Sequence, residues 1–423
     1  MKSIAIVGAS LAGLRSAEAL RQQGFTGRLT VIGAERHLPY DRPPLSKDFL
    51  LGTVEQADLA LAEADDYAEL AADWRLGIWA ERLDPASGRV VLSDGTSVHA
   101  DGVVIATGGT PRTLPGTKGV VGVHTLRTIE DAIALRAALA EKPEHVVVVG
   151  AGFLGAEVAA SARELGLSVT VLEALDVPLA PIIGREMGTI AGQLHTGNGV
   201  DLITGHGVAG LLTSTEPGRR RVRMVCLDNG RELPADLVVV AIGMRPNSDW
   251  LAGSRIPVNN GVLTDAGWLT EIPAVAAVGD VARHERGPGG VRHEHWTNAS
   301  EEPGVAMANL LAGRHTAHCT CRGYFWSDQY GVRIQFAGSI APTDDVRIID
   351  GDPAERAFLA SYHRGDATTG VLAMNMAKGF NRARRTLITA LEEDTCPSCS
   401  SGASGRNRRP AAEPTSSIPS IRA

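Results

Sequence analysis

The chain has 423 residues, of which 44% are hydrophobic and 21% are charged, which is typical of a globular protein with two or three domains. Its formal net charge of −7 argues against nucleic acid as the main partner, and its longest apolar runs are far too short to span a membrane. The five scattered cysteines do not form a secreted disulfide framework, and no signal peptide precedes the first strand-like run, so we expect a cytoplasmic protein.

Two segments of the chain repeat the same order of strand, glycine turn, helix and strand. They span residues 3–35 and 145–174, and their separation indicates a domain-scale duplication. Further strand-like runs, each followed by a turn, occupy residues 102–112, 235–247 and 274–280. Continuous apolar strands that alternate with helices predict parallel sheets covered on both faces. We therefore expect an α/β fold with two Rossmann-like dinucleotide-binding domains.

Residues 40–47 read YDRPPLSK. Proline fixes φ and removes a backbone donor, so Pro43 and Pro44 predict a rigid, extended segment with no helix before Leu45. The segment is either a surface loop with two solvated cations or a support that directs Lys47 at a functional site.

The chain changes character after the second repeat. Residues 324 to about 393 alternate apolar and polar positions as antiparallel strands do, and a helix is expected over 381–393, so we predict a third, α+β domain. From Thr395 onward the chain is rich in Ser, Pro and Gly and is expected to be disordered.

The second glycine turn has every part of a dinucleotide-binding site. Gly150 would make the tight turn, Gly152 would let a pyrophosphate approach the backbone, and Gly155 would let helix and strand pack closely. Glu173 ends the next strand, where its carboxylate would bind the adenosine ribose and repel a 2′-phosphate, and Ala174 supplies no compensating cation. The turn therefore predicts NADH rather than NADPH, against the alternative of a tight turn without a ligand.

The first glycine turn departs from this pattern. It reads Gly8-Ala-Ser10-Leu-Ala-Gly13, with a serine where the second glycine is expected and Glu35 after the next strand. A serine fits if its side chain turns away or itself contacts phosphate, so we predict a second nucleotide site here.

Several strings resemble the NADH-dependent ferredoxin reductases of the two-dinucleotide-fold flavoproteins, which serve bacterial haem monooxygenases and Rieske-type dioxygenases. They are GASLAG, PYDRPPLSK, EHWTNA and FWSDQYG, and the resemblance covers about residues 1–394. It implies an FAD domain over 1–111 and 245–318, an NADH domain over 112–244, an α+β interface domain over 319–394 and a disordered tail over 395–423.

The resemblance also implies site residues. For FAD they are Gly8, Ser10, Leu11, Ala12 and Gly13 at the pyrophosphate, Glu35 at the ribose, and Arg42, Lys47, Ala80, Thr107, Gly108, Arg112, Asp280 and Trp296 around the rest. For NADH they are Gly150, Gly152, Phe153, Leu154, Gly155, Glu157, Glu173 and Gly243. The alternative for Asp280 is a simple turn carboxylate.

The expected chemistry follows from where cysteine is absent. Residues 1–225 contain no cysteine, whereas disulfide reductases of this superfamily place their reactive pairs there, so hydride would pass from NADH to FAD and electrons would leave the flavin directly. Lys47 near the flavin would need a counter-charge, which the resemblance assigns to Glu157. The alternative for Glu157 is an acid in the first turn of its helix, favoured by the helix dipole.

The resemblance places Trp326 beside the flavin where a ferredoxin docks, and the alternative is a core aromatic of the third domain. It places Trp296 near the flavin edge, where the alternative is again a core aromatic. Arg333, Arg382, Arg384 and Arg385 either present positive charge to an acidic ferredoxin or form a solvated helix face. Two departures from the family pattern are Glu301-Glu302-Pro303, at the expected flavin packing, and Pro181, in the NADH domain. Cys396 and Cys399 are interpreted as an adventitious pair, and no metal site is expected.

The expected function is a ferredoxin reductase that takes hydride from NADH onto FAD and passes single electrons to an iron–sulfur ferredoxin, which supplies a haem monooxygenase or Rieske-type dioxygenase. We expect a monomer or weak dimer without nucleic-acid or membrane partners. The alternatives are a flavin NADH oxidase, a reductase of small acceptors, and a redox sensor of the apoptosis-inducing-factor type.

Overall fold

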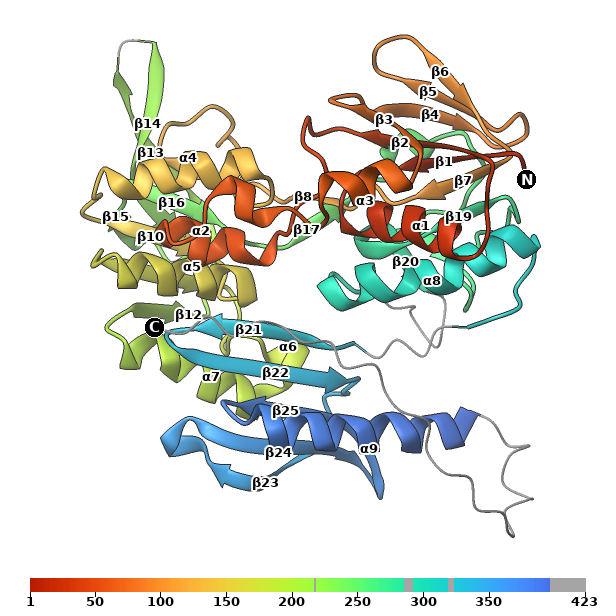
Figure 1. The fold of residues 1–423 in the computed structure, drawn as a ribbon. Helices are drawn as coiled ribbons and strands as arrows, with labels where there is room; N and C mark the ends of the chain where they lie inside the picture. Colours follow the sequence, from red (N-terminus) through yellow and green to blue (C-terminus); the bar gives the residue numbers. More distant parts are fainter. Residues whose placement is uncertain (217, 285–291, 319–322, 396–423) are drawn as a thin grey trace.

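The computed structural model describes residues 1–216, 218–284, 292–318 and 323–395. Two units with parallel sheets lie side by side, and a third unit with an antiparallel sheet lies beneath them (Figure 1). The predicted fold class is confirmed. Within the described residues no helix is both long and apolar enough to cross a membrane.

The first unit is built on a five-stranded parallel sheet. The strands in spatial order are β19 (Val275–Ala277), β7 (Gly102–Ile105), β1 (Ser3–Val7), β2 (Arg28–Gly33) and β3 (Ala72–Leu76). Helices α1 (Leu11–Gln22) and α8 (Trp296–Ala312) pack together on it, with α3 (Ala64–Glu69) nearby. A separate antiparallel sheet contains β4 (Ala80–Asp84), β5 (Arg89–Leu92) and β6 (Ser97–His99), and β18 (Val262–Thr264) pairs with β20 (Ala282–His284). Val7 pairs with Ile32 and Ile105, so the strands end together at one edge of the sheet.

The second unit repeats the design. Its parallel sheet has the order β12 (Asp201–Thr204), β11 (Val169–Glu173), β10 (Val146–Val149), β16 (Leu237–Val240) and β9 (Val123–His124). The helices are α4 (Ile129–Ala140), α5 (Phe153–Glu164), α6 (Ala180–Ile183) and α7 (Arg185–Gly197). A small sheet of β13 (Val208–Glu216), β14 (Arg219–Leu227) and β15 (Glu232–Pro234) extends from it. The antiparallel pair β8 (Gly109–Pro111) and β17 (Met244–Pro246) joins the two units.

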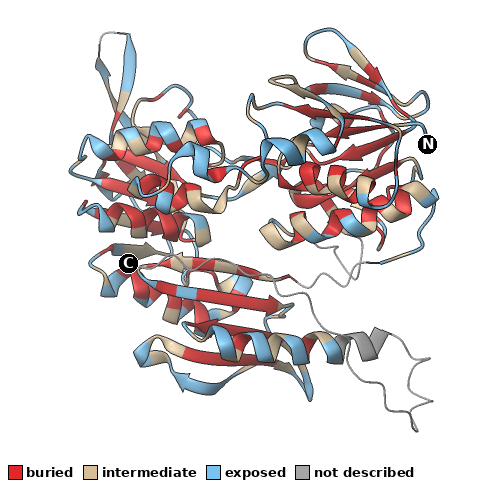
Figure 2. Ribbon diagram, viewed as in Figure 1, coloured by how far each residue is buried: buried red, intermediate tan, exposed pale blue. Residues whose placement is uncertain are grey.

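The third unit is an antiparallel sheet in the order β21 (Phe325–Gln329), β22 (Val332–Gly338), β25 (Ala367–Met374), β24 (Ala357–Arg364) and β23 (Asp345–Asp352). Buried side chains on one face pack against α6 and α7, and the other face is covered by α9 (Ala377–Thr395). Figure 2 shows buried residues through the sheets and exposed residues along the outer helix faces. The helix expected over 381–393 is longer in the structure, where α9 runs from Ala377 to Thr395. Thr395, which was expected to begin the disordered tail, therefore still belongs to the helix. The expected disordered tail otherwise lies outside the described residues, as do its two cysteines.

The segment around YDRPPLSK differs from its prediction. Pro43–Ser46 forms the 3₁₀-helix η1, directly followed by α2 (Asp48–Leu51). The extended prediction was wrong because proline's fixed φ and missing N–H are also well tolerated in the first turn of a helix. The side chains of Leu45, Phe49 and Leu50 belong to the core of the second unit. A segment that leaves the first sheet is thus anchored on the second, which brings Lys47 to the boundary between the two units.

Candidate active site

Two adjoining cavities run along the carboxyl edge of the first sheet. One, of about 520 Å³, contains Gly8, Glu35, Ala80 and Thr107 in its wall, and the other, of about 280 Å³, contains Leu11, Ala12, Lys47, Glu157, Asp280, Trp296 and Trp326. Both share Ser10, Arg42, Ala106, Gly108 and Arg127. The structure thus places most of the predicted FAD residues along one continuous groove, at the strand ends where α/β proteins bind their ligands.

The first glycine turn is closed by contacts with its own backbone. A Cβ on Gly8, which has φ +124°, would lie 2.0 Å from the carbonyl oxygen of Ala106, and one on Gly13 would lie 1.8 Å from that of Gly8. Ser10 precedes α1 without capping it, and its Oγ accepts a hydrogen bond from Arg42 Nε at 3.2 Å. The serine side chain therefore turns toward a cation, while the N–H groups of the first helical turn are left without a side-chain cap.

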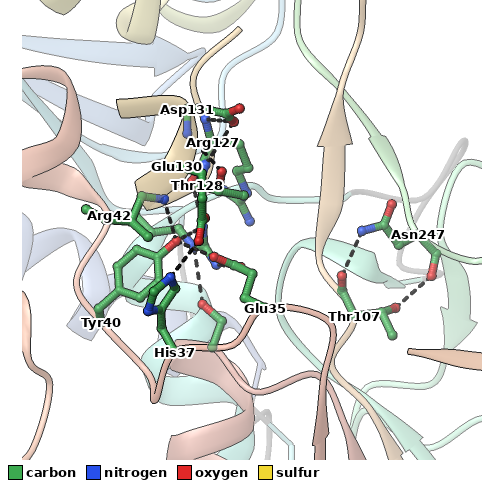
Figure 3. Close-up of polar contacts among 12 residues, drawn as sticks. Glu35, His37, Tyr40, Arg42, Thr107, Arg127, Thr128, Glu130, Asp131 and Asn247 are labelled. Atoms are coloured by element: carbon green, nitrogen blue, oxygen red, sulfur yellow. Dashed lines mark hydrogen bonds and ion pairs between the residues drawn. The ribbon is translucent and has the colours of Figure 1, made fainter. Parts of the chain in front are cut away.

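A partly buried cluster surrounds Arg42 at the larger cavity (Figure 3). Arg42 forms an ion pair with Glu35 at 2.6 Å and donates to the backbone carbonyl of Arg127 at 2.6 Å. The Tyr40 hydroxyl donates to Glu35 and accepts from the Ile129 amide. Burial raises the pKa of Tyr40, so its hydroxyl remains a donor at neutral pH. The cluster orients the Glu35 carboxylate, which keeps acceptor capacity because each oxygen has two lone pairs.

Arg127 is a site residue that sequence reasoning missed. It lies in the walls of both cavities, and its Nη2 donates to Asp280 Oδ2 at 2.7 Å. The following residues form a capping box between Thr128 and Asp131 at the start of α4. The capping box is visible in the string RTIED and could have placed Arg127 just before a helix. Its approach to Asp280, however, depends on the packing of distant segments.

His295 was also missed and also lines the smaller cavity. Burial lowers its pKa to about 4, so the imidazole is neutral at neutral pH. Its ring lies 5.0 Å from that of Phe325 between centroids. No spacing in the sequence distinguished this histidine from an ordinary surface residue.

The expected ion pair between Lys47 and Glu157 is present, with Nζ and Oε2 2.9 Å apart. Glu157 is buried and accepts three further hydrogen bonds: from Ser46 Oγ at 2.6 Å, Ser327 Oγ at 2.8 Å and the Asp328 amide at 3.2 Å. Glu157 follows the first turn of α5, which contains no acidic residue, so its expected place in that turn was wrong. One carboxylate on the second unit therefore binds the η1–α2 segment and the third unit at once.

An aromatic row leads from the smaller cavity to the protein surface. Trp296 donates from Nε1 to Asp41 Oδ1 at 2.8 Å, and its ring centroid is 6.0 Å from that of Trp326. Trp326 stacks on Tyr324 at 5.9 Å. The guanidinium of Arg333 lies 5.9 Å from the centroid of the Trp326 ring, and that of Arg384 lies 4.3 Å from the centroid of the Tyr324 ring. Trp326 and Trp296 line the cavity and are only partly buried, which disfavours the alternative of core aromatics.

The residues expected at NADH are divided between two places. Phe153 and Leu154 open α5 and join Glu157 in the wall of the smaller cavity. Glu173 lies at the glycine turn, where it accepts hydrogen bonds from the Ala151 amide at 2.9 Å and the Leu175 amide at 3.0 Å. A Cβ on Gly152 would meet no atom within 4 Å, which leaves room for a ligand at the backbone.

Arg112 and Gly243 are among the expected residues that lie outside both cavities. Arg112 is exposed, and its Nε donates to the Met244 carbonyl at 3.3 Å in the strands that join the units. Its backbone follows β8, and its amide donates to the Gly243 carbonyl; its expected role at FAD stays a prediction. Gly243 is exposed after β16, where its carbonyl accepts from the Arg112 amide.

Comparison with known proteins places this geometry in a family. The model of the pyridine nucleotide-disulphide oxidoreductases matches residues 2–302, and the reductase C-terminal model matches residues 324–396. The chain belongs to the pyridine nucleotide-disulphide oxidoreductase family. Members of this family use FAD and NAD(P)H.

Relatives of the oxidoreductase family match nearly the whole chain. Rhodocoxin reductase of Rhodococcus erythropolis is 35% identical, over 92% of this chain and 90% of its own length. Putidaredoxin reductase of Pseudomonas putida is 33% identical, over 92% of each chain. The crystal structure of the covalent putidaredoxin reductase–putidaredoxin complex contains a chain that superposes with a TM-score of 0.86 at 31% identity, covering 94% of this chain and 99% of that one.

The residues at the cavities fit FAD. The turn around Gly8 and Gly13 leaves no room for side chains and directs the uncapped start of α1 at the groove, an arrangement that binds phosphate. Arg42 and Arg127 supply positive charge beside it. The family name refers to disulphide chemistry, but this chain has no cysteine before Cys226, and none of the described residues that line the two cavities is a cysteine.

Proposed function

We propose that this oxidoreductase is an NADH-dependent ferredoxin reductase that passes single electrons to an iron–sulfur ferredoxin of a haem monooxygenase or Rieske-type dioxygenase. The observation that carries the proposal is the smaller cavity, which joins the Lys47–Glu157 ion pair to the surface row that ends at Trp326 and Tyr324. A nicotinamide would enter beside the ion pair and electrons would leave along the aromatic row, and the described residues of the cavity wall include no cysteine.

FAD in this groove would supply acceptance of a hydride and release of single electrons. Lys47 would direct its positive charge at the ring that gains negative charge on reduction. Glu157 would orient the Lys47 ammonium and balance its charge, because a buried ammonium without a partner is costly. Ser46 and Ser327 would fix the two Glu157 oxygens.

The nucleotide assignments follow the two turns. Ser10, Leu11, Ala12, Arg42 and Arg127 would hold the FAD pyrophosphate, Glu35 its ribose, and Asp280 its ribityl chain. Glu173 would bind the ribose of NADH, with its carboxylate oriented by two backbone amides. Its negative charge would repel a 2′-phosphate and so disfavour NADPH. The proposed domains remain 1–111 with 245–318 for FAD, 112–244 for NADH and 319–394 for the interface. A cytoplasmic location remains a prediction.

The ferredoxin is proposed to dock over Trp326 and Tyr324. The guanidinium groups of Arg333 and Arg384 lie on these rings and would attract an acidic partner. The relatives' names support a partner of this class, since they include a ferredoxin–NAD(+) reductase component of an anthranilate dioxygenase system from Burkholderia cepacia.

The test is NADH-driven cytochrome c reduction by the purified flavoprotein, with and without a purified [2Fe–2S] ferredoxin of an oxygenase system. We expect strong stimulation by the ferredoxin and its loss at high ionic strength, because steering between opposite charges is screened by salt. Rapid NADH consumption with oxygen alone would favour the oxidase alternative. No turnover with any acceptor would favour the redox sensor.

A further inference from the structure

Glu302 is a buried carboxyl group next to the proposed FAD site. It lies on α8 with 2% of its surface exposed. Its Oε2 accepts a hydrogen bond from the Gly279 amide at 2.8 Å, and its Oε1 lies 3.0 Å from Asn298 Nδ2. Asp280, which lines the smaller cavity, is the residue after Gly279. Glu302 therefore holds the turn that presents Asp280, together with Arg292, whose Nη1 donates to the Asp280 carbonyl at 2.9 Å.

The charged groups around Glu302 are mainly acidic. Asp280 faces it from η4 (Gly279–Val281), and Glu301 is its neighbour on α8; both disfavour its ionised form. Strand β19 brings no titratable side chain. The charged residues of α1, which packs on α8, are already engaged: Arg15 pairs with Glu18, and Arg21 donates to backbone carbonyls. Among the described residues, no cation forms an ion pair with Glu302.

Asp280, unlike Glu302, has a counter-charge, because Arg127 Nη2 lies 2.7 Å from its Oδ2. Two carboxyl groups at one turn thus differ: one is paired, and the other is buried without a counter-charge. Burial raises the pKa of Glu302 to about 8, and the neighbouring acids act in the same direction.

We propose that Glu302 is a positioning residue that is protonated at neutral pH, holds the Gly279–Asp280 turn, and lowers the electron affinity of the adjacent flavin site when it ionises. The proposal rests on the proposed function, because it needs FAD beside Asp280.

The hydrogen bonds are compatible with the protonated form. Oε2 accepts from Gly279 in either state, and the protonated Oε1 donates to Asn298 once the amide of that residue is turned so that its oxygen faces Glu302. On ionisation the amide turns back to donate. The contacts to Gly279 and Asn298 therefore persist, and the main change is one negative charge close to the site that gains electrons.

The test compares the holoenzyme with its Glu302→Gln variant, in which the amide keeps an acceptor for Gly279 and a donor for Asn298. The midpoint potential of the bound flavin is measured across the pH range around the Glu302 pKa. We expect the two curves to coincide at acidic pH and the wild-type potential to fall below that of the variant at alkaline pH. Parallel curves throughout would overturn the proposal.

Glu301→Gln is the matched control, because it removes the same charge from an exposed position on the same helix. Its curve should keep the fall in potential at alkaline pH, displaced at most slightly toward lower pH, because Glu301 is one of the acids that raise the pKa of Glu302. A second measurement does not depend on the flavin: infrared spectroscopy at neutral pH should show a protonated carboxyl band that is lost in Glu302→Gln and kept in Glu301→Gln. Its absence from the wild type would overturn the proposal, whereas a protein purified without FAD but with this band would refute the proposed function alone.

Discussion

The two glycine turns share one backbone design and differ in their surroundings. The first has Ser10 in place of the second glycine and is enclosed by Arg42 and Arg127, whereas the second keeps Gly152 with open space at its Cβ and has the exposed Leu154 beside it. Cations and enclosure suit a nucleotide that stays bound, and an open turn with an acidic residue suits one that enters and leaves. On the proposed assignment, the same motif would serve two purposes according to what packs around it.

The largest expected effect comes from a Cβ at the start of the first turn. Gly8→Ala should reduce the free energy of unfolding by about 4 kcal/mol, because it combines strain at φ +124° with an overlap on the Ala106 carbonyl. Gly152→Ala is the control, since φ there is −73° and the space is free. Denaturant unfolding should show the loss only for Gly8→Ala, while Gly152→Ala weakens NADH binding. Equal stability of the two variants would contradict the comparison.

The Lys47–Glu157 pair connects the two regions, and its removal should have the next largest effect. Lys47→Met leaves Glu157 buried without a counter-charge and should cost about 3 kcal/mol in chemical unfolding. The double variant Lys47→Met/Glu157→Gln should recover most of this loss but not the rate at which NADH reduces the flavin, measured by stopped flow. Full recovery of that rate would argue against a role in hydride transfer.

Glu302 should give the first unit a pH-dependent stability. Its pKa is raised on folding from the ordinary 4.5 to about 8, so the folded state binds the proton more tightly. The contribution is fully present below the unfolded pKa and is lost as pH rises toward 8, by about 1.4 kcal/mol per pH unit. Glu302→Gln should remove this slope in unfolding curves between pH 5 and 8, and Glu301→Gln should keep it. An unchanged slope in Glu302→Gln would show that the group ionises normally in the folded protein.

The smallest effect should come from the acidic residue of the open turn. Glu173→Ala should weaken NADH binding about 10-fold, the loss of roughly one hydrogen bond to a charged group, and narrow the preference over NADPH. The FAD content should be unchanged. Titration calorimetry measures both nucleotides, and unaltered NADH affinity would exclude Glu173 from the ribose site.

The features that the sequence predicted well depend on local patterns. Runs such as residues 146–149 and 237–240 are apolar at every position and alternate with helical segments, which predicted buried parallel strands, and the spacing of Gly150, Gly152 and Gly155 marked a turn before a helix. The partnership of Lys47 with Glu157 came from resemblance, because 110 residues separate them.

Other features depend on packing between distant segments. The Arg127–Asp280 pair and the Ser327–Glu157 hydrogen bond join residues more than 150 positions apart, and no local pattern encodes them. Pro43 and Pro44 show a different limit, since proline is compatible with both an extended segment and a first helical turn, and the burial of Leu45 and Phe49 decided between them.

The central claim is that electrons leave this flavoprotein directly for a ferredoxin at Trp326. Its most direct test is NADH-driven cytochrome c reduction through an added [2Fe–2S] ferredoxin, comparing the wild type with Trp326→Ala and with Ile349→Ala, which truncates an exposed apolar side chain on β23 of the third unit, outside both cavities. We predict that Trp326→Ala lowers the ferredoxin-dependent rate severalfold while NADH still reduces its flavin at the wild-type rate, and that Ile349→Ala retains the ferredoxin-dependent rate. A ferredoxin-dependent rate in Trp326→Ala equal to that of the wild type would contradict the account.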